Sequence, residues 1–522
     1  MSYRRSHGSP WRFGPGFALA LLTAAAPALA DPPTVTREQV AAALPALDAF
    51  AKKLVEAGAV PGLAVAVVFD DEVVFTGGYG VREVGKPDAV DADTVFQLAS
   101  FSKPISSTVV AALVSEGVVS WDSRIADLDP QFRLHDAYPS AEVTIRDLFS
   151  HRSGLPGTAG DDLEDIGYDR AAILSRLRLA VSSSSFRAGY SYSNFGLTEG
   201  AVAAAKPTGE SWEQVAEERL YRPLGMASTS SRHADFLIRK DRAALHVRVG
   251  GAWAAQVKRD ADAQSPAGGV SGSVRDLAQW MRLELGDGVY AGKTLIAKAA
   301  IAQTHAPLFA RGANPVTGGA SFYGLGWNVE YGRHGLTWGH AGAFSVGART
   351  LVSLFPKAKL GVVVLTNAFP TGVPEGVADT FADLVFDGKA DKDWTTAWNG
   401  AYEGLFGPAM ATAKAAYATP PAQPSAALPD AAYVGRYANA YVGDAFVVAA
   451  NGGMTLEVGP DRKRSYALRH FDRDLFLYFP DLETPDLPYA LSFAIGPDGR
   501  ATRMTAGSLN AVGLGVLERV GE

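Results

Sequence analysis

The chain of 522 residues contains no cysteine. This absence excludes disulfide bonds, thiolate metal sites and a cysteine nucleophile, whatever compartment the protein occupies. The nine histidines form no His-Glu-x-x-His pattern and no other close ligand spacing of the kind that metal enzymes use. We therefore expect neither a metal site nor another cofactor.

The chain also carries fewer positively than negatively charged side chains. Lys and Arg number 48 against 55 Asp and Glu, which gives a formal net charge of −7 at pH 7. Proteins that bind nucleic acids usually carry a basic surface that neutralises phosphates. We expect no nucleic-acid partner. A hydrophobic content of 47% and a charged content of 20% are ordinary for a globular protein and argue against disorder.

The apolar run at the N-terminus, residues 16–30, is shorter than the roughly 20 residues that a membrane span needs. Arginines 4, 5 and 12 precede it, and Ala28-Leu29-Ala30 is a pattern that signal peptidase accepts. We predict that residues 1–30 are a cleaved signal peptide and that the protein is periplasmic or secreted, with no stable membrane anchor. Cleavage before Asp31 removes three arginines and no acid, which takes the net charge to −10. A retained anchor and a twin-arginine signal are the alternatives.

Strand-like segments at residues 62–80 and 323–368 enclose a region dominated by helical patterns and loops. We therefore expect distant parts of the chain to form one sheet, with a cleft between this sheet and the helical part. We predict an α/β (α+β) domain over residues 31–400 and an Ala/Pro-rich linker over residues 401–427. Short alternating strands with hairpin signals predict a small antiparallel barrel over residues 428–522.

Aromatic residues are frequent in this C-terminal region, where alternation alone predicts that they form its core. They are Tyr433, Tyr437, Tyr441, Phe476, Tyr478 and Phe479.

Residues 98–107, LASFSKPISS, place Ser100 three residues ahead of Lys103. Apolar residues at 105, 109, 112 and 113 predict a helix from about Ser100 to Glu116, stopped by Gly117, so both side chains share one face. A serine hydroxyl needs a base to act as a nucleophile, and a buried lysine can lose its proton and become that base. The alternative is a serine that caps a helix and a lysine that faces water.

Two later segments carry further polar side chains. GYSYSNFG places Tyr192 two residues before Asn194 on a predicted loop, where a packed tyrosine and a turn-forming asparagine are the alternative. TWGHAGAFS places His340 two residues before Gly342 among strand residues, where a glycine lets a ligand or another backbone approach closely. A structural histidine is the alternative there.

Ser-x-x-Lys, Tyr-x-Asn and His-x-Gly in this order resemble the motifs of the serine β-lactamase, penicillin-binding-protein and D-aminopeptidase/esterase superfamily. Further stretches look similar, and the resemblance covers roughly residues 38–390. They are SHRSGLPG from Ser150, YRPLGM from Tyr221, SPAGGVSGSVRDLAQWM from Ser265 and YGLGW from Tyr323. The resemblance implies a class C β-lactamase-like antiparallel sheet flanked by helices, with a helical subdomain. The C-terminal region resembles the lipocalin-like domain appended to some of these hydrolases.

The resemblance also implies a role for each matching residue. Ser100 would be the acylated nucleophile and Lys103 its base, sharing the proton with Tyr192. Tyr192 would pass that proton to the leaving group. Asn194 would hydrogen-bond the substrate amide and Lys103.

The third motif is expected to complete the site. His340, where many relatives carry lysine, would orient Tyr192 or meet a substrate carboxylate. The backbone N–H groups of Ser100 and Ala343 would form the oxyanion hole, with Gly342 against the substrate. Lysine is a permanent cation suited to the carboxylate of a β-lactam, whereas histidine is mostly neutral near pH 7.

The sequence therefore favours a secreted serine hydrolase that opens amide bonds of D-amino-acid peptides through an acyl-enzyme, as a D-aminopeptidase or DD-peptidase does. An esterase or class C-type β-lactamase of the same fold is an alternative, as is a catalytically silent penicillin-binding-like interaction protein. An α/β-hydrolase is disfavoured because AFSVG around Ser345 lacks the first glycine of Gly-x-Ser-x-Gly.

The expected partners are a small peptide, ester or β-lactam substrate, and the barrel could pair subunits. No motif assigns a separate base for deacylation, and Glu164 in GDDLEDIG is a candidate without a supporting pattern.

Overall fold

The computed structural model describes residues 35–450, 452–480 and 487–521. The predicted signal peptide, residues 1–30, lies outside this described part. Within it, no helix combines the length and the apolar character that crossing a bilayer requires.

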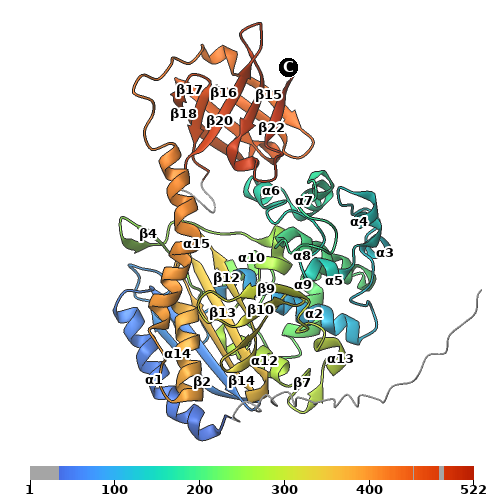
Figure 1. Cartoon of the computed structure of the whole chain (residues 1–522), viewed down its shortest axis with the longest axis vertical. Helices are drawn as coiled ribbons and strands as arrows, with labels where there is room; N and C mark the ends of the chain where they lie inside the picture. The colour runs from blue at the N-terminus through green and yellow to red at the C-terminus, as the bar shows by residue number, and fades with distance from the viewer. Residues whose placement is uncertain (1–34, 451, 481–486, 522) are drawn as a thin grey trace, which may run out of the picture. The chain divides into compact units, whose positions relative to one another are not determined.

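The centre of the N-terminal part is an eight-stranded antiparallel sheet with the order β2-β1-β14-β13-β12-β11-β10-β9. Figure 1 labels β2, β14, β13, β12, β10 and β9 of this sheet. Leu63 of β1 pairs with Thr366 of β14, so strands from opposite ends of this part are neighbours. This confirms the prediction of one sheet completed by distant segments. The strands are β1 (Gly62–Phe69), β2 (Glu72–Gly80), β9 (Phe309–Ala313), β10 (Ala320–Tyr323), β11 (Asn328–Gly332), β12 (Gly335–Phe344), β13 (Ala348–Phe355) and β14 (Leu360–Thr366).

Both faces of this sheet are buried at its centre. Every residue of β1 is buried, and its alternate side chains enter two different cores. Val65 and Val67 pack with residues of α1 (Arg37–Glu56) and α14 (Val373–Asp387). Ala64 and Ala66 belong to the core of the opposite face. A strand with two covered faces is apolar throughout rather than alternating, as GLAVAVVF is.

The opposite face is covered by α2 (Ser102–Ser115), α12 (Val274–Leu285) and the helical insert. The remaining α-helices of this insert are short apart from α8. They are α3 (Ile125–Leu128), α4 (Ala137–Glu142), α5 (Ile145–Phe149), α6 (Asp161–Asp165), α7 (Arg170–Arg176), α8 (Asn194–Ala205), α9 (Trp212–Ala216), α10 (His233–Ile238), α11 (Ser265–Gly268) and α13 (Lys298–Ile301).

Three two-stranded ribbons and several single turns complete this part. The ribbons are β3 (Phe96–Gln97) with β6 (Ser271–Gly272), β4 (Val247–Val249) with β5 (Ala252–Ala254), and β7 (Val289–Tyr290) with β8 (Lys293–Thr294). The turns are η1 (Ala99–Phe101), η2 (Leu177–Leu179), η3 (Lys206–Thr208), the π-helical η4 (Glu217–Tyr221), η5 (Asp262–Gln264) and η6 (Pro356–Ala358).

Helix α15 (Trp394–Ala416) runs through the first part of the predicted linker, residues 401–427. The Asp393 side chain caps it by accepting a hydrogen bond from the Thr396 N–H. The linker prediction gave weight to prolines, but Pro408 is accommodated inside the helix and the surrounding alanines are strong helix formers. Residues 401–416 are therefore helical.

The C-terminal strands form the closed antiparallel barrel that the sequence predicts. Its strands are β15 (Gly435–Asn439), β16 (Gly443–Ala450), β17 (Gly453–Val458), β18 (Arg464–Asp472), β19 (Leu475–Tyr478), β20 (Tyr489–Ile495), β21 (Ala501–Ala506) and β22 (Val516–Val520), with turns η7 (Asp430–Ala432), η8 (Pro460–Arg462) and η9 (Gly507–Leu509).

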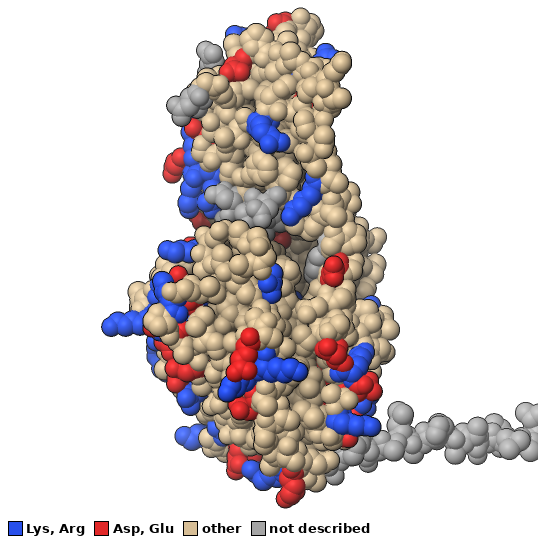
Figure 2. Space-filling view, turned by 90° about the vertical axis from the view of Figure 1, so that its left-hand side faces the viewer, with Lys and Arg blue, Asp and Glu red and all other residues tan. Residues whose placement is uncertain are grey.

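Five of the six predicted core aromatics of this region are buried, but Phe479 is 43% exposed because it lies just past the end of β19. In the lower half of the view in Figure 2, Lys and Arg side chains lie beside Asp and Glu side chains.

Candidate active site

Ser100 lies in the one-turn helix η1, directly ahead of α2. The N-terminus of α2 has no side-chain cap, so Ser100 is not the helix cap of the alternative interpretation. Ala99 has a φ of 50°, a left-handed conformation that is costly for a residue with a Cβ. Hydrogen bonds hold this turn in place: the Leu98 N–H donates to the Val270 carbonyl, and the Thr350 hydroxyl donates to the Leu98 carbonyl.

Lys103 is completely buried, and all other residues of α2 from Ser102 to Leu113 are buried as well. Its Nζ lies 2.9 Å from Ser100 Oγ, 2.8 Å from Asn194 Oδ1 and 2.9 Å from the Ala267 carbonyl oxygen. Burial lowers the pKa of Lys103 to about 7, against a smaller opposing effect from the negative charge of Asp161. At neutral pH this amine is therefore close to the point at which it loses its proton.

Tyr192 and Asn194 flank the start of α8. The phenol of Tyr192 shares a hydrogen bond with Ser100, and Lys103 Nζ lies 4.5 Å from the centre of its ring. Burial raises the pKa of Tyr192 well above its usual value. The Ser193 hydroxyl caps α8 by accepting from the Gly196 N–H, which fixes the residues on either side. The structure thus gathers Ser100, Lys103, Tyr192 and Asn194 at one place.

Strand β12 lies directly against η1, the turn that carries Ser100. A Cβ built on Gly342 would lie 2.1 Å from the Leu98 carbonyl oxygen and 2.9 Å from the Phe101 nitrogen. Only glycine lets the strand come this close to η1 without displacing backbone. Ala343, the next residue, is half-buried, and His340 on the same strand is buried.

A chain of hydrogen bonds connects two histidines through Tyr323. His340 Nδ1 lies 2.7 Å from the Ala341 carbonyl, so Nδ1 carries the proton and Nε2 accepts from the Tyr323 hydroxyl at 3.1 Å. His151 Nδ1 accepts from the Ser193 N–H at 3.1 Å, so its Nε2 donates to the Tyr323 oxygen at 3.3 Å. Nε2 of His340 therefore bonds Tyr323 rather than Tyr192.

Both histidines are neutral in this arrangement. Burial, followed by the charge of Lys103, lowers the pKa of His340 to about 3. The same two causes lower the pKa of His151 well below its usual value. A neutral His340 offers no positive charge to a substrate carboxylate.

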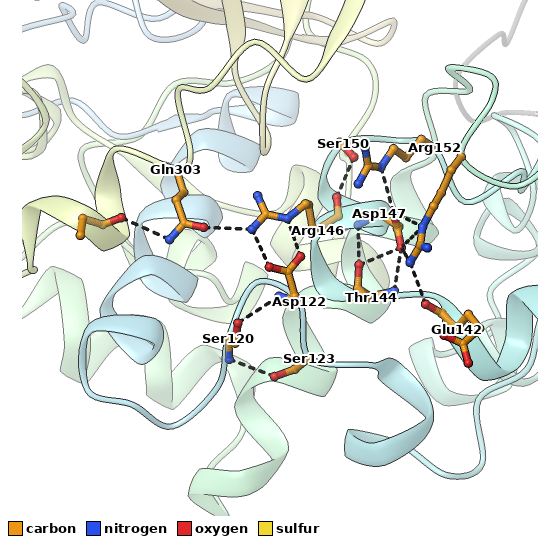
Figure 3. Close-up of polar contacts among 12 residues, drawn as sticks. Ser120, Asp122, Ser123, Glu142, Thr144, Arg146, Asp147, Ser150, Arg152 and Gln303 are labelled. Carbon is orange, nitrogen blue, oxygen red and sulfur yellow. Dashed lines mark hydrogen bonds and ion pairs between the residues drawn. The ribbon is translucent and has the colours of Figure 1, made fainter.

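Asp147 joins the two loops that carry His151 and Tyr192. Figure 3 shows Asp147 between Thr144 and Arg152. Its buried carboxylate binds Arg152 at 2.8 Å and Arg187 at 2.8 Å. Burial acts to raise its pKa, but hydrogen bonds from Arg187 and Thr144 and the charge of Arg152 together lower it.

The backbones of these loops are also joined. The Arg187 N–H donates to the Arg152 carbonyl, and the Ser191 N–H donates to the His151 carbonyl, both at 2.8 Å. The loop that ends at Tyr192 is therefore pinned to the turn that carries His151.

Two acids of α6 lie near these groups. Both carboxylate oxygens of Asp161 lie near Asn194 Nδ2, at 3.3 and 3.4 Å. Oε2 of Glu164 instead binds Arg259 and Gln264, each at 2.5 Å. Glu164, the unsupported candidate for a deacylation base, is thus occupied by a buried ion pair.

One group in the described ranges has the spacing to hold a metal ion: His334, Asp383 and Asp387. Arg333 already pairs with both of these carboxylates. This group shares no residue with the cluster around Ser100.

Sequence reasoning missed three residues of this site: His151, Tyr323 and Asp161. His151 and Tyr323 stand in SHRSGLPG and YGLGW, the stretches quoted for the family resemblance, but no pattern indicated that their side chains meet. Asp161 precedes Asn194 by 33 residues, and its contact depends on the fold of the helical insert.

Two family models match the chain. One described as Beta-lactamase matches residues 47–386, and one described as a domain of unknown function (DUF3471) matches residues 419–511. Penicillin-binding protein 4 of Amycolatopsis lactamdurans is 29% identical over 325 residues, which are 59% of this chain and 81% of that protein. Unguisins hydrolase ungD of Aspergillus violaceofuscus (strain CBS 115571) is 27% identical over 242 residues, 42% of this chain and 41% of that protein, so less than half of that relative is spanned.

Two solved structures share the fold. The octameric penicillin-binding protein homologue from Pyrococcus abyssi has a TM-score of 0.56 and 18% identity, covering 91% of this chain and 99% of that one. SurE has a TM-score of 0.53 and 23% identity, covering 92% of this chain and 100% of that one.

The reactivity of Ser100 is expected to depend on pH through Lys103. Because the pKa of Lys103 is about 7, protonation below that pH removes the acceptor for the serine proton. The rate of Ser100 labelling by a fluorophosphonate should fall about tenfold per pH unit well below pH 7 and level off above pH 8. Ser100→Ala serves as the unlabelled control, and a flat rate from pH 5 to 8 would contradict this role of Lys103.

Replacing Asp147 by alanine should destabilise the protein. Removing one partner of a buried ion pair costs roughly 3–5 kcal/mol, and the partial exposure of both arginines lowers this to about 2–3 kcal/mol. The measurement is the free energy of unfolding in urea near pH 7. Because the pKa of Asp147 is lowered in the folded state, its contribution is present at neutral pH and is lost as the pH falls into the acid range. Equal stability of variant and parent at pH 7 would show that the contacts are dispensable.

Proposed function

Because the chain belongs to the β-lactamase family, we propose that it is a serine hydrolase that cleaves amide bonds through an acyl-enzyme on Ser100. The observation that carries this proposal is the 2.9 Å contact between Ser100 Oγ and the buried amine of Lys103. We further propose that the substrates are peptides containing D-amino acids and that the protein is exported to meet them.

Acylation begins with proton transfer from Ser100 to neutral Lys103. A neutral amine has two N–H donors and one lone pair, so it can donate to Asn194 and Ala267 while accepting the serine proton. The serine oxygen then attacks the substrate carbonyl, and a tetrahedral oxyanion forms. The backbone N–H groups of Ser100 and Ala343 are the proposed donors to that oxyanion.

Collapse of this intermediate breaks the carbon–nitrogen bond. Tyr192, which shares a hydrogen bond with Ser100, gives its phenolic proton to the leaving nitrogen and regains a proton from protonated Lys103. Water then attacks the acyl-enzyme, its proton passes to the same pair of groups, and the acid product leaves with Ser100 restored. No separate acid is needed for deacylation, which agrees with the engagement of Glu164 by Arg259.

Three neighbouring residues hold these groups in place but take no part in the proton transfers: His340, Tyr323 and His151. Their hydrogen bonds fix the neutral forms of both histidines, so neither histidine adds a positive charge beside Lys103. Since positive charge nearby would lower the pKa of Lys103 further, neutral partners keep that pKa near the working pH.

The names of two relatives support the proposed substrate class. A relative at 29% identity carries the name penicillin-binding protein 4, and another at 27% identity is named a hydrolase of unguisins. Esters and β-lactams would use the same groups, but a neutral His340 lacks the charge that a β-lactam carboxylate favours. A catalytically silent interaction protein would have no chemical need to bring Ser100, Lys103, Tyr192 and Asn194 into contact.

Substitution of the reacting groups should abolish turnover while the fold persists. Ser100→Ala is expected to remove activity, and Lys103→Ala and Tyr192→Phe should each lower kcat/KM at least about a hundredfold, the scale of positioned proton transfer. The measurement is release of p-nitroaniline from D-alanine and L-alanine p-nitroanilides by the purified protein, with circular dichroism as a check of folding. Unchanged turnover by folded Ser100→Ala would overturn the proposal.

A further inference from the structure

Asp161 places a carboxylate beside the proposed catalytic groups, and none of the described residues forms an ion pair with it. It is half-buried at the start of α6, and its hydrogen-bond partner is the neutral amide of Asn194. Among the described residues, no Lys, Arg or His nitrogen lies within ion-pair distance of it, although Lys103 lies on the other side of Asn194. Burial, with the nearby charge of Glu164, raises the pKa of Asp161 to about 7.

The neighbouring acids differ in this respect. Glu164 pairs with Arg259 at 2.5 Å, and Asp162 accepts hydrogen bonds from the Tyr441 hydroxyl at 2.7 Å and from the Leu163 N–H at 3.0 Å. Each of those two carboxylates thus has strong donors of its own. Asp161 has two long contacts to one amide, so an approaching cationic group would meet little competition.

The position of Asp161 is well fixed. The Gly160 N–H donates to the Tyr441 hydroxyl at 2.9 Å, and that hydroxyl donates to Asp162, so α6 is held on both sides of Asp161. Gly160 has a φ of 93°, and a Cβ there would lie 2.8 Å from the Phe195 ring. Asn194, the partner of Asp161, is the residue next to Phe195. Backbone and side-chain contacts therefore hold Asp161 next to Asn194, beside the proposed reacting groups.

We propose that Asp161 binds the ammonium group of the substrate and selects acyl donors that carry a free α-amine next to the scissile carbonyl. This inference rests on the proposed function, because it assumes that Ser100 attacks that carbonyl. The α-amine of a peptide is largely protonated at neutral pH and is the cation closest to its first carbonyl. Asn194, in contact with both Lys103 and Asp161, spans the short distance between the site of attack and the site of amine binding.

Binding of the ammonium group would also activate the base. The negative charge of Asp161 raises the pKa of Lys103 and favours its protonated form. An ammonium group on Asp161 cancels that effect, so Lys103 releases its proton when a suitable substrate is bound. Two further cations act on this region. Arg311 hydrogen-bonds Asn328 and stacks over the Tyr190 ring, and Arg349 pairs with Glu375.

The test compares substrates that differ in the amine alone: D-alanine p-nitroanilide and N-acetyl-D-alanine p-nitroanilide, with the matching methyl esters as a second pair. The parent protein should prefer the free amine roughly tenfold to a hundredfold in kcat/KM, the range of a charge-assisted hydrogen bond. Asp161→Asn should lose this preference, so that both members of each pair are hydrolysed at similar rates, and circular dichroism shows whether the variant is folded.

Asp162→Asn is the matched control, because it removes the same charge from the adjacent residue and an amide can still accept from Tyr441. It should retain the preference for the free amine. Equal rates on both members of each pair by the parent, or an equal loss on both by Asp161→Asn, would overturn amine recognition and leave Asp161 as a residue that orients Asn194. Turnover of the esters without the anilides would refute the amidase proposal while still testing the amine preference. No Ser100-dependent turnover of either pair would overturn both.

Discussion

Burial of the Lys103 amine is the constraint on which the rest of the site depends. A charged ammonium loses its hydration inside a protein, so complete burial brings the charged and neutral forms of Lys103 close in free energy near pH 7. Three acceptors from different parts of the chain then satisfy the amine: Ser100, Asn194 and the Ala267 carbonyl. A lysine on an exposed helix face would remain protonated and could not serve as a base. The helical insert is therefore part of the proposed chemistry as well as of the fold.

The surroundings of this lysine combine strain with extensive hydrogen bonding. Ala99 and His151 both adopt left-handed backbone conformations, with φ of 50° and 55°. Such conformations persist where the surrounding contacts over-determine them. Here the Leu98 backbone, Thr350 and the ion pairs of Asp147 hold the two turns. The strain thus lies at the segments that present Ser100 and support Tyr192.

Much of the fold followed from local patterns, and the errors have physical causes. Apolar runs and turn residues predicted the sheet and the barrel because these depend on burial and hairpin chemistry within short segments. The first part of the predicted linker is helical, because α15 accommodates Pro408 and alanine favours helix. Phe479 was assigned to the core because alternation continues one residue past β19. In the site, Ser100 and Lys103 could be paired from helical spacing, while Tyr192, Asn194 and His340 needed the family resemblance.

The sequence by itself determined the order of the motifs, the local helix that places Lys103 one turn after Ser100, and the absence of any cysteine chemistry. The tertiary structure alone decided that Lys103 is wholly buried, that Tyr323 links two neutral histidines, and that Asp161 faces Asn194. The physical reason is the distance along the chain over which each interaction acts. Helical spacing is set by neighbouring residues, whereas desolvation and proton positions depend on side chains that the folded chain brings together from tens to hundreds of residues away.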